Sequence, residues 1–383
     1  MATTVTAPVT NNIDLASQFL PILDEIYKRA SLTARLDTSS EMVRFIGAKT
    51  VNLFSTNMVG LSNYSRNGGF VPGDVNGSWE PYTINVDRGR SYMVDVMDND
   101  ETIGMAFGTL VGETERTQIV PEVDAYRFAK YADASGLKAT PTTIATSTNV
   151  IDMIDEATAA MDDNEVPTEG RILFVSSNCY KQIKKNITRY IQNGEADVNT
   201  DVGYYNDMPV ISVPQSRFNT AITLNAPTTA AGVGGYTLAG VPINFMIVHP
   251  SAVMQLVKHV VPRIFSPEVN QESDAWKFDY RIYHDCWVKD NKVNGIYLSA
   301  AAPTTAMAVS ASTAAPKVGA TTTVTLSNAQ GTVRVVSSDE TKATATEKDG
   351  TVTITGVAVG SATLTITDGI GQTATVAVTV SAS

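Results

Sequence analysis

The stretch EPYTINVDRGRSYMVDVMDNDET, residues 80–102, carries the strongest structural signal in the chain. Apolar side chains alternate there with polar or small ones, which is the period of a β-strand. The alternating apolar residues are Tyr82, Ile84, Val86, Tyr92, Val94 and Val96. A single strand of about fifteen residues would be about 50 Å long at roughly 3.3 Å per residue, whereas typical strands have about 3–10 residues. We expect this strand to reach beyond the body of its own domain.

A projecting strand with an apolar row needs cover from outside its own subunit, because large exposed apolar surfaces mark interaction sites. Residues 43–54 are predicted to be its partner strand, and residues 57–79, rich in Gly, Asn and Pro, the tip of an extended hairpin. The tip lacks the Lys-Ser/Thr of a phosphate loop. Its candidate intersubunit contacts are Asn67, Gly68, Gly69, Phe70 and Trp79. The pattern as a whole predicts a protein that builds an assembly.

Two arginines interrupt the apolar row of this strand. On strict alternation Arg88 and Arg90 share a face with Tyr82 and Tyr92. Either Gly89 marks a β-bulge that resets the register, or the guanidinium groups meet carboxylates of another subunit. The second interpretation makes Arg88 and Arg90 candidate intersubunit contacts, because an arginine fork pairs with a carboxylate through two hydrogen bonds.

Length and composition limit the class of protein. The 383 residues carry a net charge of −11 and are 43% hydrophobic, so we expect one to three globular domains with a sizeable core. The acidity argues against a dedicated nucleic-acid binder. The two cysteines, Cys179 and Cys286, make no disulfide framework, which favours folding in a reducing cytosol. We expect neither a secretory signal nor a membrane span.

The composition changes sharply near residues 299–303, SAAAP. Every Trp, Tyr and Phe precedes this point, and the chain after it is rich in Thr, Val, Ala and Gly. Short alternating runs separated by glycines predict a β-sandwich of about seven strands over residues 303–383. The alternative is a disordered, low-complexity tail.

The first domain is predicted to be α+β, with helices and strands of uneven length. Pro121 is expected to kink one long helix and Gly136 to cap it. The predicted helices are 15–30, 100–136, 148–161, 178–191 and 251–258. The predicted strands are 171–176, 209–213 and 241–248, followed by the runs 276–288 and 292–298.

Familiar catalytic and metal-binding motifs are absent from the sequence. It contains no HExxH, CxxC or GxSxG, no GxGxxG after a strand and no Walker-type loop. His284-Asp285-Cys286 is the one close cluster of titratable groups with a nucleophile, and on a strand His284 and Cys286 share a face. A Cys–His pair is one interpretation and a structural role is the other. We predict no enzyme, no cofactor and no metal.

Two charged clusters each allow two interpretations. Asp95, Asp98, Asp100 and Glu101 could hold a cation or act as acid and base, or Asp98-Asn99-Asp100 could end the strand and cap the next helix. A basic helix face could bind phosphate or an acidic partner, or simply be solvated. That face comprises Lys181, Lys184, Lys185 and Arg189.

Several segments resemble the major capsid protein of tailed bacteriophages, which has the Hong Kong 97-like fold. They are DRGRSYMVDVMDNDET (87–102), TERTQIVPEVDAYRFAKYA (114–132), RILFVSSNCYKQIK (171–184), MPVISVPQSRF (208–218) and FDYRIYHDCWVKDNKVNGIYL (278–298). The resemblance implies an N-terminal arm over residues 1–40 and a shell domain over 41–302. Within the shell domain it implies an extension loop at about 43–97, a spine helix at about 101–134 and an axial domain at about 145–255. Residues 260–298 would return to the peripheral domain.

The resemblance also implies partners. Hexamers and pentamers of the chain would form an icosahedral head around double-stranded DNA, with portal and scaffolding proteins, in a virion assembled in the host cytoplasm. A decoration protein is a further partner that the family admits. We match no crosslinking Lys–Asn pair. The alternatives are a bacterial nanocompartment (encapsulin-like) shell protein, a surface adhesin and a Cys–His enzyme.

Residues 317–381 are similar to bacterial Ig-like domains of group two. The Ser-Ser-Asp of that group stands at Ser337-Ser338-Asp339, and the antibody cysteine pair is absent. This resemblance implies a domain on the outer surface, with weak glycan binding as its expected activity.

Overall fold

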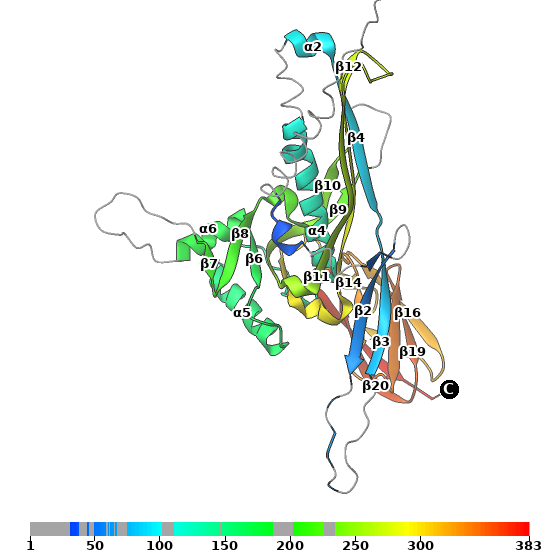
Figure 1. The fold of residues 1–383 in the computed structure, drawn as a ribbon. Coiled ribbons are helices and arrows are strands. Elements are labelled where there is room, and N and C mark those ends of the chain that lie inside the picture. Colours follow the sequence, from blue (N-terminus) through cyan, green and yellow to red (C-terminus); the bar gives the residue numbers. More distant parts are fainter. Residues whose placement is uncertain are drawn as a thin grey trace, which may run out of the picture. The chain divides into compact units, whose positions relative to one another are not determined.

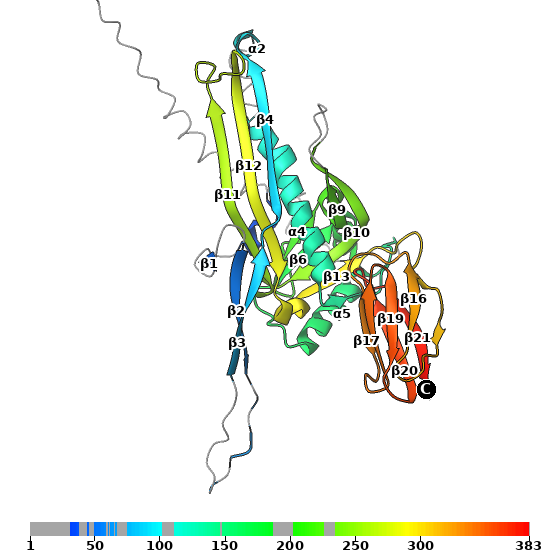
Figure 2. The same ribbon diagram turned by 90° about the vertical axis from the view of Figure 1, so that its right-hand side faces the viewer.

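The computed structural model is drawn as a ribbon in Figures 1 and 2. The chain divides into two compact units. Unit 1 comprises Met1–Asp24, Leu36–Val111 and Gln255–Trp287, and unit 2 comprises Glu25–Arg35, Gly112–Met254 and Val288–Ser383. The structure describes residues 31–37, 44–45, 50–58, 60, 62–64, 66, 75–101, 111–145, 148–186, 202–225 and 234–382. The predicted helix 15–30 and the tip residues Asn67–Phe70 lie outside these ranges. The chain is α+β, with several sheets.

The first sheet of unit 1 contains the predicted hairpin. Its order is β1 (Arg44–Phe45), β2 (Thr50–Met58) and β3 (Val75–Thr83). β2 and β3 pair antiparallel, from Thr50 opposite Thr83 to Met58 opposite Val75. The partner strand predicted at 43–54 is therefore confirmed over its second half. The predicted tip is too long, because β2 extends to Met58 and β3 already begins at Val75.

The second sheet of unit 1 has the order β11 (Val253–Phe265), β12 (Ala275–Val288) and β4 (Val86–Asp95). Figure 2 shows these three strands side by side along their length. The helix predicted at 251–258 is wrong, because only the 3₁₀ turn η5 (Pro250–Ala252) precedes β11. The β-branched side chains of Val253, Val257 and Val260 favour a strand, and pairing with β12 satisfies its backbone.

The single long strand predicted over residues 82–96 is wrong, because β3 and β4 belong to different sheets. Ile84 and Asn85 separate them. Tyr283 Oη donates to Ile84 O at 2.9 Å, and Asn85 N donates to Asp285 Oδ2 at 2.9 Å. Ile84 is 1% exposed and packs with Val51 and Leu256. The predicted alternation nevertheless holds, since every odd residue from 81 to 95 is exposed.

The end of β4 corrects the predicted helix cap. Helix α2 (Val96–Glu101) begins directly after Asp95, and Met97 N donates to Asp95 Oδ1 at 2.9 Å. Asp95 therefore caps this helix, whereas the predicted cap, Asp98–Asp100, lies inside it. Asp98 stands in the first turn, where a negative charge is favourable.

The main sheet of unit 2 is seven-stranded among the residues that the structure describes. Six strands follow the order β5-β13-β10-β6-β8-β7, and β9 pairs with β10. Their bounds are β5 Leu137–Lys138, β6 Ile172–Ser176, β7 Tyr204–Tyr205, β8 Met208–Val213, β9 Asn219–Leu224, β10 Tyr236–Val248 and β13 Ile296–Ala300. The strands predicted at 171–176, 209–213 and 241–248 are confirmed, and β10 begins five residues earlier than predicted.

Three helices accompany this sheet. Helices α5 (Val150–Asp163) and α6 (Ser177–Asn186) pack on it around a buried cluster that includes Ile154, Leu173 and Phe245. Helix α4 (Val120–Ala134) follows a π-helical segment, η3 (Glu115–Ile119), directly before Pro121. A π-helical segment is one of the recognised causes of a helix kink, so the hydrogen-bond pattern changes next to Pro121 while the helix continues.

The predicted role of Gly136 as a helix cap is wrong. Ser135 is the cap residue of α4, in an extended conformation, and Gly136 is not among the residues with positive φ. Gly136 N donates to Val293 O at 2.8 Å, and an added Cβ would lie 2.7 Å from Val293 C. Glycine is needed here because η6 (Asp290–Gly295) approaches closely.

The C-terminal region contains two four-stranded sheets (Figure 2). One has the order β14 (Ala308–Val309), β16 (Thr321–Ser327), β19 (Thr351–Gly356), β18 (Ala343–Lys348). The other has the order β15 (Thr313–Ala314), β21 (Thr373–Val380), β20 (Gly360–Thr367), β17 (Arg334–Ser337). They share one buried cluster, whose members include Val324, Ile354, Leu364 and Val376. Ser299 and Ala300, inside the predicted linker, are buried in β13.

Candidate assembly interface

Strand β4 is an edge strand with an open side among the strands that the structure describes. Among the described strands it pairs with β12 alone, from Val86 opposite His284 to Asp95 opposite Ala275. Next in this register, Val96 N donates to Asp274 O at 3.2 Å. Hydrogen-bonded pairs alternate in an antiparallel ladder, so even-numbered residues of β4 face β12 with their backbone groups. The odd-numbered residues direct N–H and C=O toward the open edge, which is a template for a further strand.

On the face that carries the odd-numbered side chains, the centre of this edge is uncharged, while the charged Arg88 and Arg90 lie on the other face. Proteins usually protect an edge strand with charges, a proline or a bulge. The register runs past Gly89 without a shift, so of the two interpretations of Arg88 and Arg90 the one with a bulge at Gly89 is excluded. Gly89 and Ser91 are small and exposed at the centre, with carboxylates only toward the ends, at Asp87 and Asp95. An added Cβ at Gly89 would lie 3.0 Å from Tyr280 O, so glycine also allows close pairing with β12.

Arg88 and Arg90 stand on the opposite face of β4 from these odd residues, as the alternation predicts. They lie across from Ile282 and Tyr280 in the register with β12. Arg88 is half-buried and Arg90 is exposed. Both residues have an interaction inside the chain. Their contact with a second subunit stays a prediction.

Unit 1 leaves many apolar side chains exposed. Trp79, one of the candidate contacts, is 53% exposed on β3. Of the large exposed apolar residues in the described part of the chain, seven lie in unit 1 and five in unit 2. The seven are Tyr64, Trp79, Met93, Met97, Val257, Val260 and Val269. These side chains and the open edge of β4 make unit 1 the candidate interface. Asn67, Gly68, Gly69 and Phe70 lie outside the described residues.

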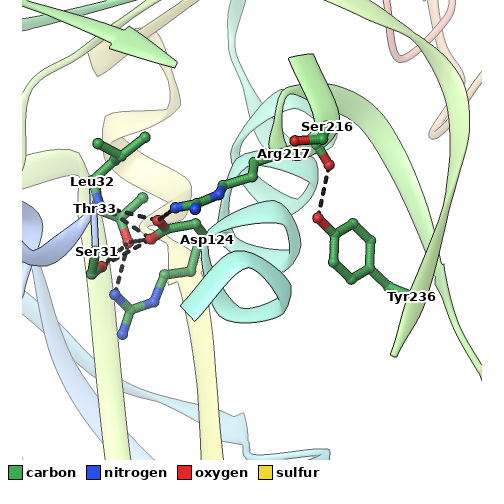
Figure 3. Close-up of polar contacts among 8 residues, drawn as sticks. Ser31, Leu32, Thr33, Asp124, Ser216, Arg217 and Tyr236 are labelled. Atoms are coloured by element: carbon green, nitrogen blue, oxygen red, sulfur yellow. Dashed lines mark hydrogen bonds and ion pairs between the residues drawn. The ribbon is translucent and has the colours of Figure 1, made fainter. Parts of the chain in front are cut away.

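A second feature, in unit 2, anchors residues 31–33 on helix α4 (Figure 3). Asp124 of α4 is fully buried and accepts hydrogen bonds from Ser31 Oγ at 2.9 Å, Leu32 N at 3.0 Å and Thr33 Oγ1 at 2.7 Å. Thr33 N also donates to it at 3.4 Å. Arg217 Nη1 lies 3.4 Å from Asp124 Oδ2 and supplies the opposite charge. A buried carboxylate needs such partners, because an unpaired one is very costly.

Arg127, one turn further along α4, completes the anchor. Its side chain is fully buried, and Nη1 donates to Thr33 Oγ1 at 2.9 Å. Tyr236 Oη donates to Ser216 O at 2.8 Å, which holds η4 (Gln215–Arg217) on β10 (Figure 3). The sequence reasoning missed this anchor. The available signal was Asp124 and Arg127 at spacing i, i+3 within an apolar helix stripe.

The structure gives the His284-Asp285-Cys286 cluster a position in the core of unit 1. All three side chains are at most 2% exposed. Asp285 accepts hydrogen bonds from Asn85 N and Cys286 N, both at 2.9 Å. The other thiol, Cys179, has its pKa raised to about 11 by burial, so it stays protonated near neutral pH. These contacts support the structural interpretation of the cluster.

The remaining charged groups assemble no metal site. No group of three or more His, Cys, Asp or Glu side chains that could hold a metal ion occurs among the described residues. On α6, Lys184 Nζ lies 4.5 Å from the centre of the Tyr180 ring, while Lys181 and Lys185 are exposed. Arg189 lies outside the described ranges. In the part of the chain that is described, no helix has the length and apolarity needed to cross a membrane.

Comparison with protein-family models and with curated proteins gave no match. Solved structures that resemble the chain include one from Mycobacterium phage Che8, at 12% identity and a TM-score of 0.46, covering 66% of this chain and 85% of the other. The capsid of the cyanophage P-SCSP1u matches at 13% identity with a TM-score of 0.48, covering 72% of this chain and 89% of the other. A virus-like particle from Pyrococcus furiosus matches at 12% identity with a TM-score of 0.45, covering 75% of this chain and 99% of the other. At these low TM-scores the likenesses assign neither fold nor function to the chain.

Proposed function

We propose that the chain is the repeating subunit of a closed protein shell. The observation that carries the proposal is the edge of β4, ten residues long and unpaired on one side among the described strands. Exposed apolar side chains of the same unit, among them Trp79, Met93 and Met97, add surface that other copies would cover. Contacts of this kind, repeated around closed symmetry, make a stable container from weak individual interactions.

More specifically, we propose that the chain is the major capsid protein of a tailed phage. The resembling segments 87–102 and 114–132 fall on β4 with α2 and on η3 with α4. The extension loop, 43–97, would contain β1 to β4, and the axial domain, 145–255, would contain α5, α6 and β6 to β10. Hexamers and pentamers would enclose double-stranded DNA without specific binding, since the chain is acidic. Portal, scaffolding and decoration proteins would be its further partners.

The decisive experiment is expression of the chain, alone and together with a scaffolding protein from the same source, followed by electron microscopy of the products. Closed shells of uniform size are the expected result. A chain that stays monomeric under these conditions contradicts the proposal. The contents of shells purified from their natural source distinguish the two kinds of container, since a phage head holds DNA and a nanocompartment holds enzymes.

Arg90→Glu is expected to reduce shell yield while leaving the subunit folded. The exposed guanidinium of Arg90 would meet a carboxylate of a neighbouring copy, and reversing its charge replaces attraction by repulsion. Shell yield by sedimentation and subunit folding by circular dichroism are measured together. Lys348→Glu, an exposed cation on β18 outside the candidate interface, is the charge-reversal control. Normal assembly of Arg90→Glu removes Arg90 from the interface.

For residues 303–383 we propose an Ig-like domain on the outer surface of the shell, with weak glycan binding. Deleting this segment is expected to leave shells that assemble, because the open edge of β4 lies outside it. Shell formation by the deletion variant and the full-length chain is compared by electron microscopy under the same expression conditions. Complete loss of shells would show instead that the segment is part of the container.

A further inference from the structure

The C-terminal region touches the end of helix α4 through a pair of hydrogen bonds. Thr332 N donates to Asp133 Oδ1 at 2.7 Å, and Thr332 Oγ1 donates to Asp133 Oδ2 at 2.9 Å. Both oxygens of one carboxylate are thus used by one residue that lies 199 positions later in the chain. The covalent connection is short, since β13 ends at Ala300 and β14 begins at Ala308.

Two glycines of the C-terminal region allow its backbone to approach residues 133–139 closely. Gly371, between β20 and β21, has φ +95°, and an added Cβ would lie 2.6 Å from Ala139 O and 3.1 Å from Lys138 Cβ. Gly331 has φ +68°, and an added Cβ would lie 2.8 Å from Asp133 Oδ1. Both positions favour glycine because their φ angles are positive and because neighbouring atoms occupy the space that a Cβ would need. Two loops of the C-terminal region therefore lie directly against residues 133–139.

The loop that carries Gly371 is held rigid from within. Asp368 is 1% exposed and accepts hydrogen bonds from the backbone N–H of Gln330 at 3.0 Å, Ile370 at 3.1 Å and Gln372 at 2.8 Å. Ile370 is 2% exposed and does not belong to the cluster between the two sheets. An ordered loop loses little conformational entropy when it docks.

Charged groups of the C-terminal region and of the end of helix α4 both act on Lys138. Burial lowers the pKa of its ammonium group; Asp133 raises it, Arg334 lowers it and Asp368 raises it. Two of these three groups, Arg334 and Asp368, belong to the C-terminal region. Lys138 Nζ also donates to Asp133 O at 3.4 Å. The contact thus combines close backbone approach, hydrogen bonds and alternating charge.

We propose that Asp133, Thr332 and the two glycines form a clamp that fixes the C-terminal region on the end of helix α4 in one orientation. The region then moves with the helix as one body and does not swing on its linker. The loops around Thr332 and Gly371 are occupied by the chain itself, so an external ligand has to bind elsewhere on the region. The clamp belongs to the single chain and does not depend on what the chain assembles into.

The test is a distance distribution between two spin labels, recorded by pulsed electron paramagnetic resonance on the full chain. Ala159→Cys on α5 and Thr346→Cys on β18 place labels at exposed positions, while the native Cys179 and Cys286 are buried. Labelled chain is diluted into unlabelled chain, so that distances within one chain are recorded even when copies associate. Asp133→Ala and Thr332→Ala are then compared with the labelled parent, and Asp163→Ala, at the exposed last residue of α5, is the matched control.

The parent and Asp163→Ala are expected to give one narrow distribution. Asp133→Ala loses both hydrogen bonds and is expected to broaden it about twofold or more, because a released domain samples the range of its linker. Thr332→Ala keeps the backbone hydrogen bond, so the width of its distribution is expected to lie between those of the parent and Asp133→Ala. This variant tests the clamp even where Asp133→Ala disturbs folding. A broad distribution in the parent, or narrow ones in both clamp variants, would overturn the proposal.

Discussion

Ser91→Pro is expected to abolish shell assembly while the subunit itself stays folded. Ser91 lies at the centre of the open edge, where its N–H points away from β12. Proline has no N–H, and its ring blocks the approach of another strand. Edge strands tolerate proline when that N–H does not face a partner. We expect shell yield by sedimentation to fall about tenfold or more, since the lost contact recurs at every subunit of a closed assembly.

Two further variants make this result specific. Ser91→Ala keeps the backbone N–H and is expected to assemble like the parent. Arg90→Pro removes an N–H that faces β12, so it is expected to unfold the sheet, which shows in circular dichroism as well as in assembly. Folded Ser91→Pro subunits that form shells at the parental yield would exclude the β4 edge from assembly contacts.

Local periodicity predicted the faces of β4 correctly, because burial on one side of a strand imposes a period of two. The same periodicity could not show that the strand breaks at Ile84–Asn85. The break depends on Tyr283 and Asp285, about 200 positions later in the chain. A pattern of side chains says which face is covered, whereas the sheet to which a strand belongs is decided by distant partners.

The segment after His249 shows a second limit. Residues 251–258 carry apolar residues at spacings that fit a short helix as well as a strand, and short apolar runs do not distinguish the two. Pairing with β12 makes the segment a strand. For the candidate interface, the sequence placed Arg88 and Arg90 on one face. Contact with another copy depends on a second molecule, which no pattern within one chain contains.

The anchor of the N-terminal segment gives the largest expected effect on stability. Asp124→Ala is expected to lower the free energy of unfolding of unit 2 by about 3–5 kcal/mol, the cost of leaving one member of a buried ion pair uncompensated. The variant removes the acceptor of Ser31, Leu32 and Thr33 and leaves Arg217 without the carboxylate that it pairs with. Urea unfolding followed by circular dichroism measures the change, with Asp163→Ala as the exposed control.

If the loss of stability comes from the broken ion pair, a double variant should reveal it. Asp124→Ala combined with Arg217→Met removes the positive charge that the first change leaves behind, so the double variant should lose less stability than the sum of the single ones. Asp124→Asn keeps the size of the side chain and removes its charge, and is expected to fall between the parent and Asp124→Ala. If the two single losses simply add, the anchor acts by packing alone. A loss below about 1 kcal/mol for Asp124→Ala, the range of an exposed pair, would show that these contacts do not hold the N-terminal segment on α4.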